Sequence, residues 1–235
     1  MSQNEPLNIV DEEKNTITLT KENNQSEILL FDKVQDVFVS GFTIIQDFVY
    51  TDDTELIWLI LLTRAFNSMR CSIDLMMKGY YSQSMVLLRT ITEDWLICGA
   101  VKEYTKVRDR LLGDGKRLNY KELALRQDAL SVYENDYDFQ CKFAHSSKLS
   151  LRVMIDQEKT LKVVPSYDEL LFFACTESLY RAFLNMSVVM LKLLNSINKS
   201  KAKEWSEKNI NTRDFVINWL DNSQSKINNM KEMHK

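Results

Sequence analysis

Three side chains have the types best suited to chemistry: His145, Arg89 and Glu93. The chain has two histidines, and His234 stands in a polar tail that we expect to fray, so an imidazole general base would have to be His145. Arg89 and Glu93 are four residues apart in an otherwise apolar stretch, and a helix places such residues on one face. Arg89 would then hold a phosphate, His145 would transfer a proton and Glu93 would orient Arg89.

Each of these residues also has a purely structural interpretation. His145 stands where a helical pattern stops, so it could cap the helix end by donating to a free carbonyl or by favouring the negative end of the helix dipole. Arg89 and Glu93 could form a partly buried ion pair, in which removing one partner costs about 3–5 kcal/mol because the other charge is left uncompensated. The sequence leaves both interpretations open.

Candidates for substrate binding lie near these groups. Lys142 and Ser146 neighbour His145 in the sequence and suit a phosphate contact. Arg64 and Asn67 belong to a narrow polar stripe on the preceding helix, which is either a solvent-exposed edge or a surface facing the next helix. The members of this stripe follow one another at i, i+3, i+7 and i+10: Arg64, Asn67, Cys71 and Asp74.

Familiar catalytic and metal-binding patterns are missing from the sequence. It has no Gly-rich phosphate loop, no Gly-x-Ser-x-Gly elbow and no His-Glu-x-x-His pair, which removes P-loop, hydrolase-elbow and zincin chemistry. It also lacks the Glu-x-x-His repeats of carboxylate di-metal bundles, so we expect neither a metal nor another cofactor. The formal charge of −3 gives no overall attraction to nucleic acid, although a local basic patch stays open.

Several features favour a cytoplasmic protein without membrane contact. The four cysteines are widely spaced among apolar neighbours, which is typical of reduced, buried thiols. The N-terminus lacks the basic start and the apolar core of a signal peptide. The longest uninterrupted apolar run, residues 56–62, is far shorter than the roughly 20 residues that cross a bilayer.

Composition favours helices as the elements that position the candidate residues. Only five glycines and two prolines occur, whereas sheet folds use such residues at many turns. We therefore expect an all-α fold, an up-and-down helical bundle with long antiparallel helices over about 26–50, 55–77, 79–101 and 166–197. The helix over 79–101 is apolar almost all round and belongs in the middle. Gly79 should end the preceding helix in a left-handed conformation, which makes a tight hairpin.

The chain is expected to divide into three parts. Residues 1–25 are polar and predict a flexible segment, in which only Ile17 to Thr20 resemble a short strand. Residues 26–198 should form the bundle, including a small β-hairpin insertion at about 148–165, where the apolar period changes from 3.6 to about two. Residues 199–235 should supply a C-terminal amphipathic helix, which begins at Asn211 after a solvated joint at 198–203.

Two stretches of the sequence resemble known proteins. Gly79-Tyr80-Tyr81 followed by Leu87-Leu88-Arg89 and Glu93, and the turn Phe143-Ala144-His145-Ser146-Ser147, resemble uncharacterised bacterial helical proteins related to the HEPN superfamily, which includes abortive-infection proteins and toxin ribonucleases. The resemblance covers roughly residues 55–195 and implies a helical bundle that forms a homodimer. It departs from the ribonuclease members at one point: their Arg-x4-6-His motif would need an Arg at 138–140, where this chain has Asp138, Phe139 and Gln140.

Two functions are therefore expected as alternatives. The first is an HEPN-like protein of a bacterial stress, toxin–antitoxin or phage-defence system that is directed at RNA or a nucleotide, with metal-independent ribonuclease as the candidate activity. In it Arg89 replaces the missing Arg and Lys142 helps to neutralise phosphate. The second is a non-catalytic scaffold that binds a partner protein from the same operon through its apolar helix faces. A homodimer is expected in either case.

Overall fold

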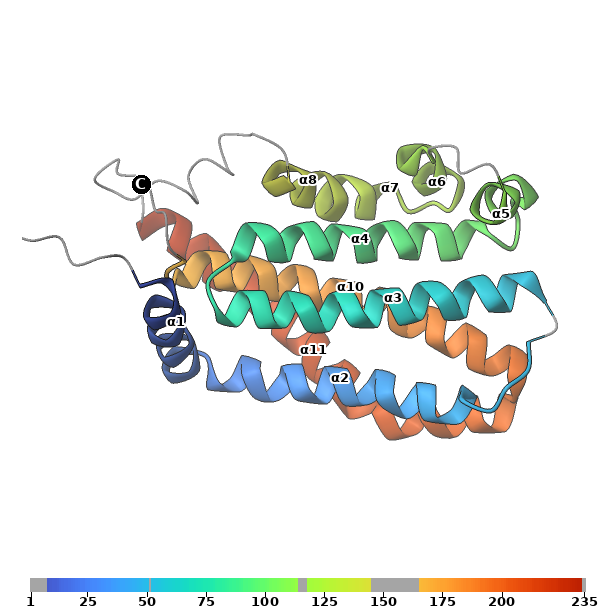
Figure 1. The fold of residues 1–235 in the computed structure, drawn as a ribbon, viewed down its shortest axis with the longest axis horizontal. Helices are drawn as coiled ribbons and strands as arrows, with labels where there is room; N and C mark the ends of the chain where they lie inside the picture. The colour runs from blue at the N-terminus through green and yellow to red at the C-terminus, as the bar shows by residue number, and fades with distance from the viewer. Residues whose placement is uncertain (1–7, 51, 114–117, 145–164, 234–235) are drawn as a thin grey trace, which may run out of the picture.

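The computed structural model describes residues 8–50, 52–113, 118–144 and 165–233. These residues form helices and turns and contain no β-strand, which confirms the all-α class (Figure 1). In chain order the helices are α1 (Ile9–Asn23), α2 (Gln25–Ile45), α3 (Asp53–Met77), α4 (Tyr81–Ala100), α5 (Thr105–Leu112), α6 (Tyr120–Arg126), α7 (Leu130–Val132), the π-helix η1 (Tyr133–Tyr137), α8 (Asp138–Ala144), α10 (Glu169–Ile197) and α11 (Lys199–Met233).

The hairpin of α3 and α4 forms the centre of the bundle. Asp52 begins α3 as its N-cap, because its side chain accepts a hydrogen bond of 2.7 Å from the Thr54 backbone N–H. Gly79 in the turn has φ +84°, the predicted left-handed conformation, and a Cβ at this position would lie 2.9 Å from the Ser166 carbonyl oxygen. The tight antiparallel hairpin expected from the sequence is therefore confirmed.

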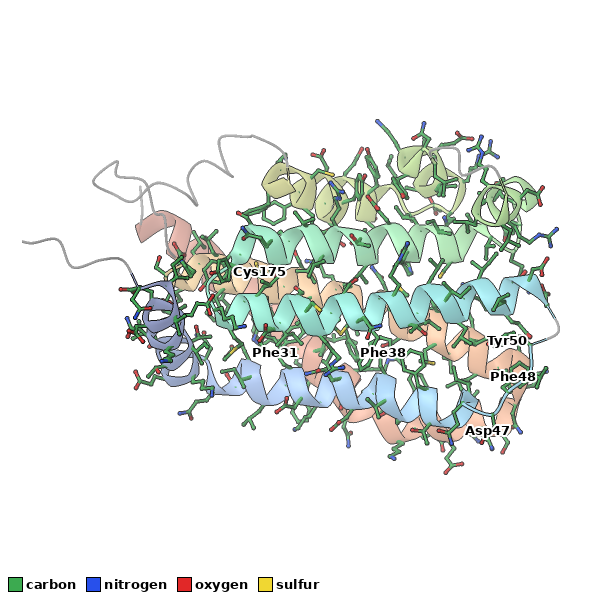
Figure 2. All side chains as sticks on the ribbon, in the orientation of Figure 1. Phe31, Phe38, Asp47, Phe48, Tyr50 and Cys175 are labelled. Atoms are coloured by element: carbon green, nitrogen blue, oxygen red, sulfur yellow. The ribbon has the colours of Figure 1, made fainter. Side chains whose placement is uncertain are left out.

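The other long helices surround this hairpin. α2 runs beside α3, α10 packs against both α3 and α4, and α11 returns along α10 and α2 (Figure 1). α3 runs opposite to both α2 and α4, and α11 runs opposite to α10. α4 and α10 run in the same direction, because the Asp168 N–H at the start of α10 donates to the Tyr81 hydroxyl at the start of α4, so the expected up-and-down order is wrong at this step. α2 ends at Ile45, earlier than predicted, and Figure 2 shows Asp47, Phe48 and Tyr50 in the connection to α3.

Aromatic side chains from α2 and α10 fill the core between these helices. Phe31 contacts both Phe172 and Tyr180, with ring centroids 6.1 Å and 5.9 Å away. Phe38 meets Phe183 edge to face, with centroids 5.9 Å apart, and both rings are completely buried. Tilted and edge-on ring pairs of this kind add about 0.5–1.5 kcal/mol each beyond their area burial. The core therefore locks α10 onto α2 behind the central hairpin.

The short helices α6, α7, η1 and α8 form an outer layer over α4 (Figure 1). The buried Thr92 hydroxyl donates to Gln140 Oε1 at 3.0 Å, and Gln127 Nε2 donates to the Leu96 carbonyl at 2.7 Å. These two contacts fasten α8 and the end of α6 to successive turns of α4. α4 is thus covered by α3, by α10 and by the outer layer, as its nearly uniform apolar surface predicts.

The N-terminal region corrects the prediction of a strand at Ile17 to Thr20. These residues lie in α1, an amphipathic helix rather than a flexible or extended segment. Thr16 and Thr20 are buried, and the Thr20 hydroxyl donates to the Thr16 carbonyl at 2.8 Å and lies 3.4 Å from the Met77 carbonyl of α3. Packing against α3 therefore overrides the strand preference of β-branched residues.

The C-terminal region corrects the predicted joint at 198–203. α11 begins at Lys199, and the Asn198 side chain caps it by accepting from the Lys201 backbone N–H at 3.0 Å. Trp205 anchors this first part of the helix, because its Nε1–H lies within hydrogen-bond distance of the Val37 carbonyl and the Ser40 hydroxyl of α2. The many lysines of this segment occupy only the exposed side of a continuous helix.

The predicted β-hairpin at about 148–165 falls on residues 145–164, which lie outside the described residues, and no described residue gives it support. Among the described helices, α3 alone is long and apolar enough to cross a membrane by length and composition, but a core helix meets the same test. In this bundle α3 packs between α4, α10 and α2.

Candidate functional site

α4 carries the charged residues around which the candidate site is built. Arg89, Glu93 and Asp94 all stand on this helix, but they serve different neighbours. Glu93 meets the outer layer through Tyr137, whereas Asp94 meets α3 through Arg64. Successive helix residues are separated by about 100° around the axis, so adjacent Glu93 and Asp94 necessarily face different partners.

Arg89 and Glu93 form the intrahelical pair that the sequence predicts. Arg89 Nε lies 3.4 Å from Glu93 Oε1, and the two side chains are 24% and 16% exposed. Among the described residues the buried Nε–H of Arg89 makes no hydrogen bond, so the pair is held by charge rather than by a well-directed bond. Glu93 also accepts a hydrogen bond of 3.2 Å from the Tyr137 hydroxyl, which ties the pair to η1.

Tyrosines of the outer layer enclose Glu93. Tyr137 stacks on Tyr133 at a centroid distance of 5.1 Å and contacts Tyr120 at 5.5 Å. Burial raises the pKa of Tyr137 well above its usual range, and burial together with the Glu93 carboxylate raises the pKa of Tyr120 to about 12. Both phenols therefore keep their protons at neutral pH and can donate to an anion. Tyr137 lies in a π-helix, a distortion that occurs frequently at functional sites.

The Arg64–Asp94 ion pair joins α3 to α4. Arg64 Nε donates to Asp94 Oδ2 at 3.0 Å, and a second guanidinium nitrogen donates to Asp94 Oδ1. The Asp94 side chain is completely buried, while that of Arg64 is 51% exposed. Burial raises the pKa of Asp94 to about 6, although Arg64 acts in the opposite direction. Arg64, a candidate for substrate binding, is thus committed to a structural partner.

Asp94 is a residue that sequence reasoning missed. The sequence did indicate that Asp94 needs a partner, because it is a second acid beside Glu93 on a helix that is otherwise apolar almost all round. Such a carboxylate must find a cation when it is buried. The polar stripe on α3 offered that cation at Arg64, thirty positions earlier in the chain.

The rest of the α3 stripe lies at the surface. Asn67, Cys71 and Asp74 are exposed, and Asn67 and Cys71 line an open groove of about 440 Å³ next to Arg64. The stripe is therefore a solvent-exposed edge, and Arg64 is its member that forms an ion pair with α4. Asn67 stands at this edge and does not join the Glu93 cluster.

The remaining site candidates lie at the end of the outer layer. Lys142 is exposed on α8 and pairs with Asp138 at 3.3 Å. α8 ends at Ala144, so His145 and Ser146 fall outside the described residues. Because α8 is fastened to α4 by the Thr92–Gln140 bond, the described chain brings Lys142 to the outer layer over α4 rather than to α3.

No set of three metal-ligating side chains gathers within the described ranges. The chain matches no family model, and no curated protein or solved structure is significantly similar to it. The chemistry of the site is therefore argued from its own groups. Arg64 faces Asp94, and Arg89 faces Glu93. Of these two arginines, Arg89 is the one whose Nε–H makes no hydrogen bond among the described residues.

Proposed function

We propose that this protein is an HEPN-like helical protein that acts on RNA or a nucleotide by a metal-independent route. The observation that carries this proposal is the state of Arg89. Its guanidinium is partly exposed, is held by Glu93 at 3.4 Å, and keeps a buried Nε–H without a hydrogen bond among the described residues. Donors of this kind recognise phosphate oxygens, which accept two parallel N–H bonds from one guanidinium.

The contacts of Glu93 support a role for this carboxylate in orienting the Arg89 guanidinium. Glu93 is itself fixed by the Tyr137 hydroxyl, so a phosphate could approach Arg89 while Glu93 stays bound to the outer layer. Tyr137 donates to Glu93, and Tyr120 contacts the Tyr137 ring, so the outer layer holds the carboxylate that orients Arg89. In this proposal His145, the residue after α8, transfers the proton, and Lys142 and Ser146 contact the phosphate.

A second function, that of a non-catalytic scaffold, is favoured by a different observation. α11 leaves large apolar side chains uncovered, with Ile210 50%, Phe215 55% and Ile217 42% exposed. Exposed apolar side chains of this size suit a partner surface. A homodimer, or a partner protein encoded in the same operon, would cover them. The phage-defence or toxin–antitoxin setting belongs to the first proposal and rests on the resemblance of the Gly79–Glu93 and Phe143–Ser147 stretches, whereas a cytoplasmic location is proposed for both functions from the widely spaced cysteines.

RNA cleavage in the presence of EDTA separates the two functions. We expect the purified chain to cleave a mixture of structured and unstructured RNA, and the variants Arg89→Lys and His145→Ala to lose about 100-fold or more of the rate, as is usual for positioned acid–base and phosphate-binding groups. Arg181→Lys is the matched control, because Arg181 forms a similar i, i+4 pair with Glu177 at 2.9 Å. Absence of cleavage in a folded, stably dimeric wild type would refute the first function and support the scaffold.

A further inference from the structure

A second cavity lies on the side of α4 that faces α10, away from the Glu93 cluster. It has a volume of about 430 Å³ and lies between α4, the end of α6 and α10. We propose that this cavity binds a nitrogen heterocycle of the nucleobase class, carried by a nucleoside or a mononucleotide. The proposal is independent of the function assigned to Arg89, because none of the residues of that cluster lines the cavity.

Gln127 supplies a fixed hydrogen-bond acceptor at this cavity. Its amide nitrogen donates to two carbonyls, those of Leu96 at 2.7 Å and Leu123 at 3.1 Å, so both of its N–H groups are occupied. The amide oxygen then points over Gly99, where a Cβ would lie only 1.6 Å from it. Gly99 is therefore required for this side chain to lie where it does, and Gln127 Oε1 is left to accept a hydrogen bond from a bound molecule.

The backbone after α6 holds Gln127 in place. Asp128 has a positive φ of 54°, and the Ala129 N–H donates to the Ala124 carbonyl at 2.9 Å. This is the left-handed end of a helix, a conformation that Asp adopts more readily than most residues. The turn is pinned to α4 by the Gln127 amide, so the acceptor oxygen belongs to a rigid part of the fold.

The rest of the lining matches a flat heterocycle rather than a lipid or a polyanion. Trp95 provides an aromatic ring, and Asn185 of α10 provides an amide that can both donate and accept. The charged side chains balance, with Arg126 and Lys192 against Glu103 and Asp128. An aromatic platform with fixed amide groups is how proteins recognise single bases, since every base has a face that stacks and an edge that forms hydrogen bonds.

The size of the cavity sets an upper bound on the ligand. Its volume of about 430 Å³ falls within the range of about 300–1,000 Å³ that holds small molecules in proteins. A single nucleoside is of this class, whereas a folded RNA is not. An exocyclic amine or ring N–H of the base would donate to Gln127 Oε1, and the sugar would lie toward the charged rim.

Calorimetric titration of the full chain with adenosine, guanosine, cytidine and uridine, and with their 5′-monophosphates, tests the proposal. We expect saturable binding of at least one base, with a dissociation constant below about 1 mM, and a similar affinity for the nucleoside and its monophosphate because the rim carries no net charge. Binding of every monophosphate regardless of base, or binding of none of the eight compounds, would overturn it.

Two substitutions locate the binding. Val188→Trp should fill the cavity and lower the affinity about tenfold or more, a loss of about 1.4 kcal/mol, and the helix should tolerate it because Val188 is 43% exposed. Val39→Trp on α2, at a valine that is 49% exposed, is the matched control and should leave the affinity unchanged. Unchanged binding in Val188→Trp would refute the site.

Gly99→Ala tests the role of Gln127, since its Cβ must displace the amide oxygen. We expect about a threefold to tenfold loss of affinity, the worth of one hydrogen bond, with an unchanged circular dichroism spectrum. If Gly99→Ala does not fold, Gln127→Leu removes the same acceptor and must show the same loss. A folded variant that binds as tightly as the wild type would contradict the assignment. The rate of RNA cleavage should be unchanged in both Gly99→Ala and Gln127→Leu, which separates this proposal from that for Arg89.

Discussion

The buried carboxyl of Asp94 makes stability depend on pH in a direction opposite to that of most ion pairs. Its side chain is completely buried, and among the described residues only Arg64, which is half exposed, pairs with it. Burial raises the pKa of Asp94 to about 6 from an ordinary value of 3.8, despite the opposing effect of Arg64. Between about pH 4 and pH 6, therefore, Asp94 is mostly protonated in the native protein and mostly ionised in the unfolded chain.

The size of the effect follows from these two pKa values. A group whose pKa is raised in the native state stabilises the fold fully below the unfolded pKa, and this contribution is lost as the pH rises through the folded pKa. Each pH unit over which only the native state is protonated is worth about 1.4 kcal/mol. Between pH 7 and pH 5 Asp94 passes from mostly ionised to mostly protonated, so we expect it to add about 1 kcal/mol to the free energy of unfolding.

Urea unfolding of the wild type and Asp94→Asn at pH 5 and pH 7, followed by tryptophan fluorescence, measures this contribution. The wild type should gain about 1 kcal/mol more than the variant on going from pH 7 to pH 5, because asparagine does not titrate. Asp136, whose pKa burial also raises to about 6, is present in both proteins and cancels. Asp74→Asn is the control, since that carboxylate is 65% exposed. If the free energies of unfolding of the wild type and Asp94→Asn differ by the same amount at both pH values, Asp94 does not titrate in this range and the reasoning is refuted.

Three further predictions concern single contacts, and each is measured by urea unfolding. Arg64→Met should cost about 3 kcal/mol at pH 7 and less at pH 5, because it leaves ionised Asp94 buried without a partner; an equal cost at both would contradict this. Gly79→Ala should cost about 1–2 kcal/mol, because alanine resists a φ of +84°. An unchanged free energy of unfolding would contradict the requirement for a left-handed residue in this turn. Trp205→Phe should cost about 1 kcal/mol through the lost indole N–H contacts to α2, whereas an unaltered midpoint would show that α11 is held by ring packing alone.

The central hairpin could be predicted from the sequence because each of its signals is local. The N-cap Asp52, the apolar side chains of α3 and the glycine at 79 all act within a few residues, and Gly79 has the left-handed conformation expected from the sequence. The near absence of glycine and proline limited the choice to helices. The uniform apolar surface of α4 then required neighbours on all sides.

The ends of the chain were mispredicted because their stability comes from distant contacts. Thr16 and Thr20 favour a strand in isolation, yet they are buried beside the end of α3. The start of α11 looks like a charged joint, yet Ala202 and Trp205 lie on its buried side at a spacing of three residues. A short apolar stripe diluted by lysines carries little periodic signal, and packing against α2 and α10 makes the helix favourable.

The candidate site shows the same limit at the level of single residues. Periodicity tells which residues share a face of α4, so the pairing of Arg89 with Glu93 could be predicted. It does not tell which helix lies opposite that face, so the Tyr137 hydroxyl on Glu93 and the Arg64 guanidinium on Asp94 were found only in the structure. The distinction bears on function, because Arg64 and Arg89 look alike in sequence. Arg64 is engaged through two nitrogens by the completely buried Asp94, whereas Arg89 is held at 3.4 Å beside Glu93, which also accepts a hydrogen bond from the Tyr137 hydroxyl. Of these two arginines, Arg89 therefore exchanges its partner for a phosphate at the lower cost, because Glu93 keeps a hydrogen-bond donor.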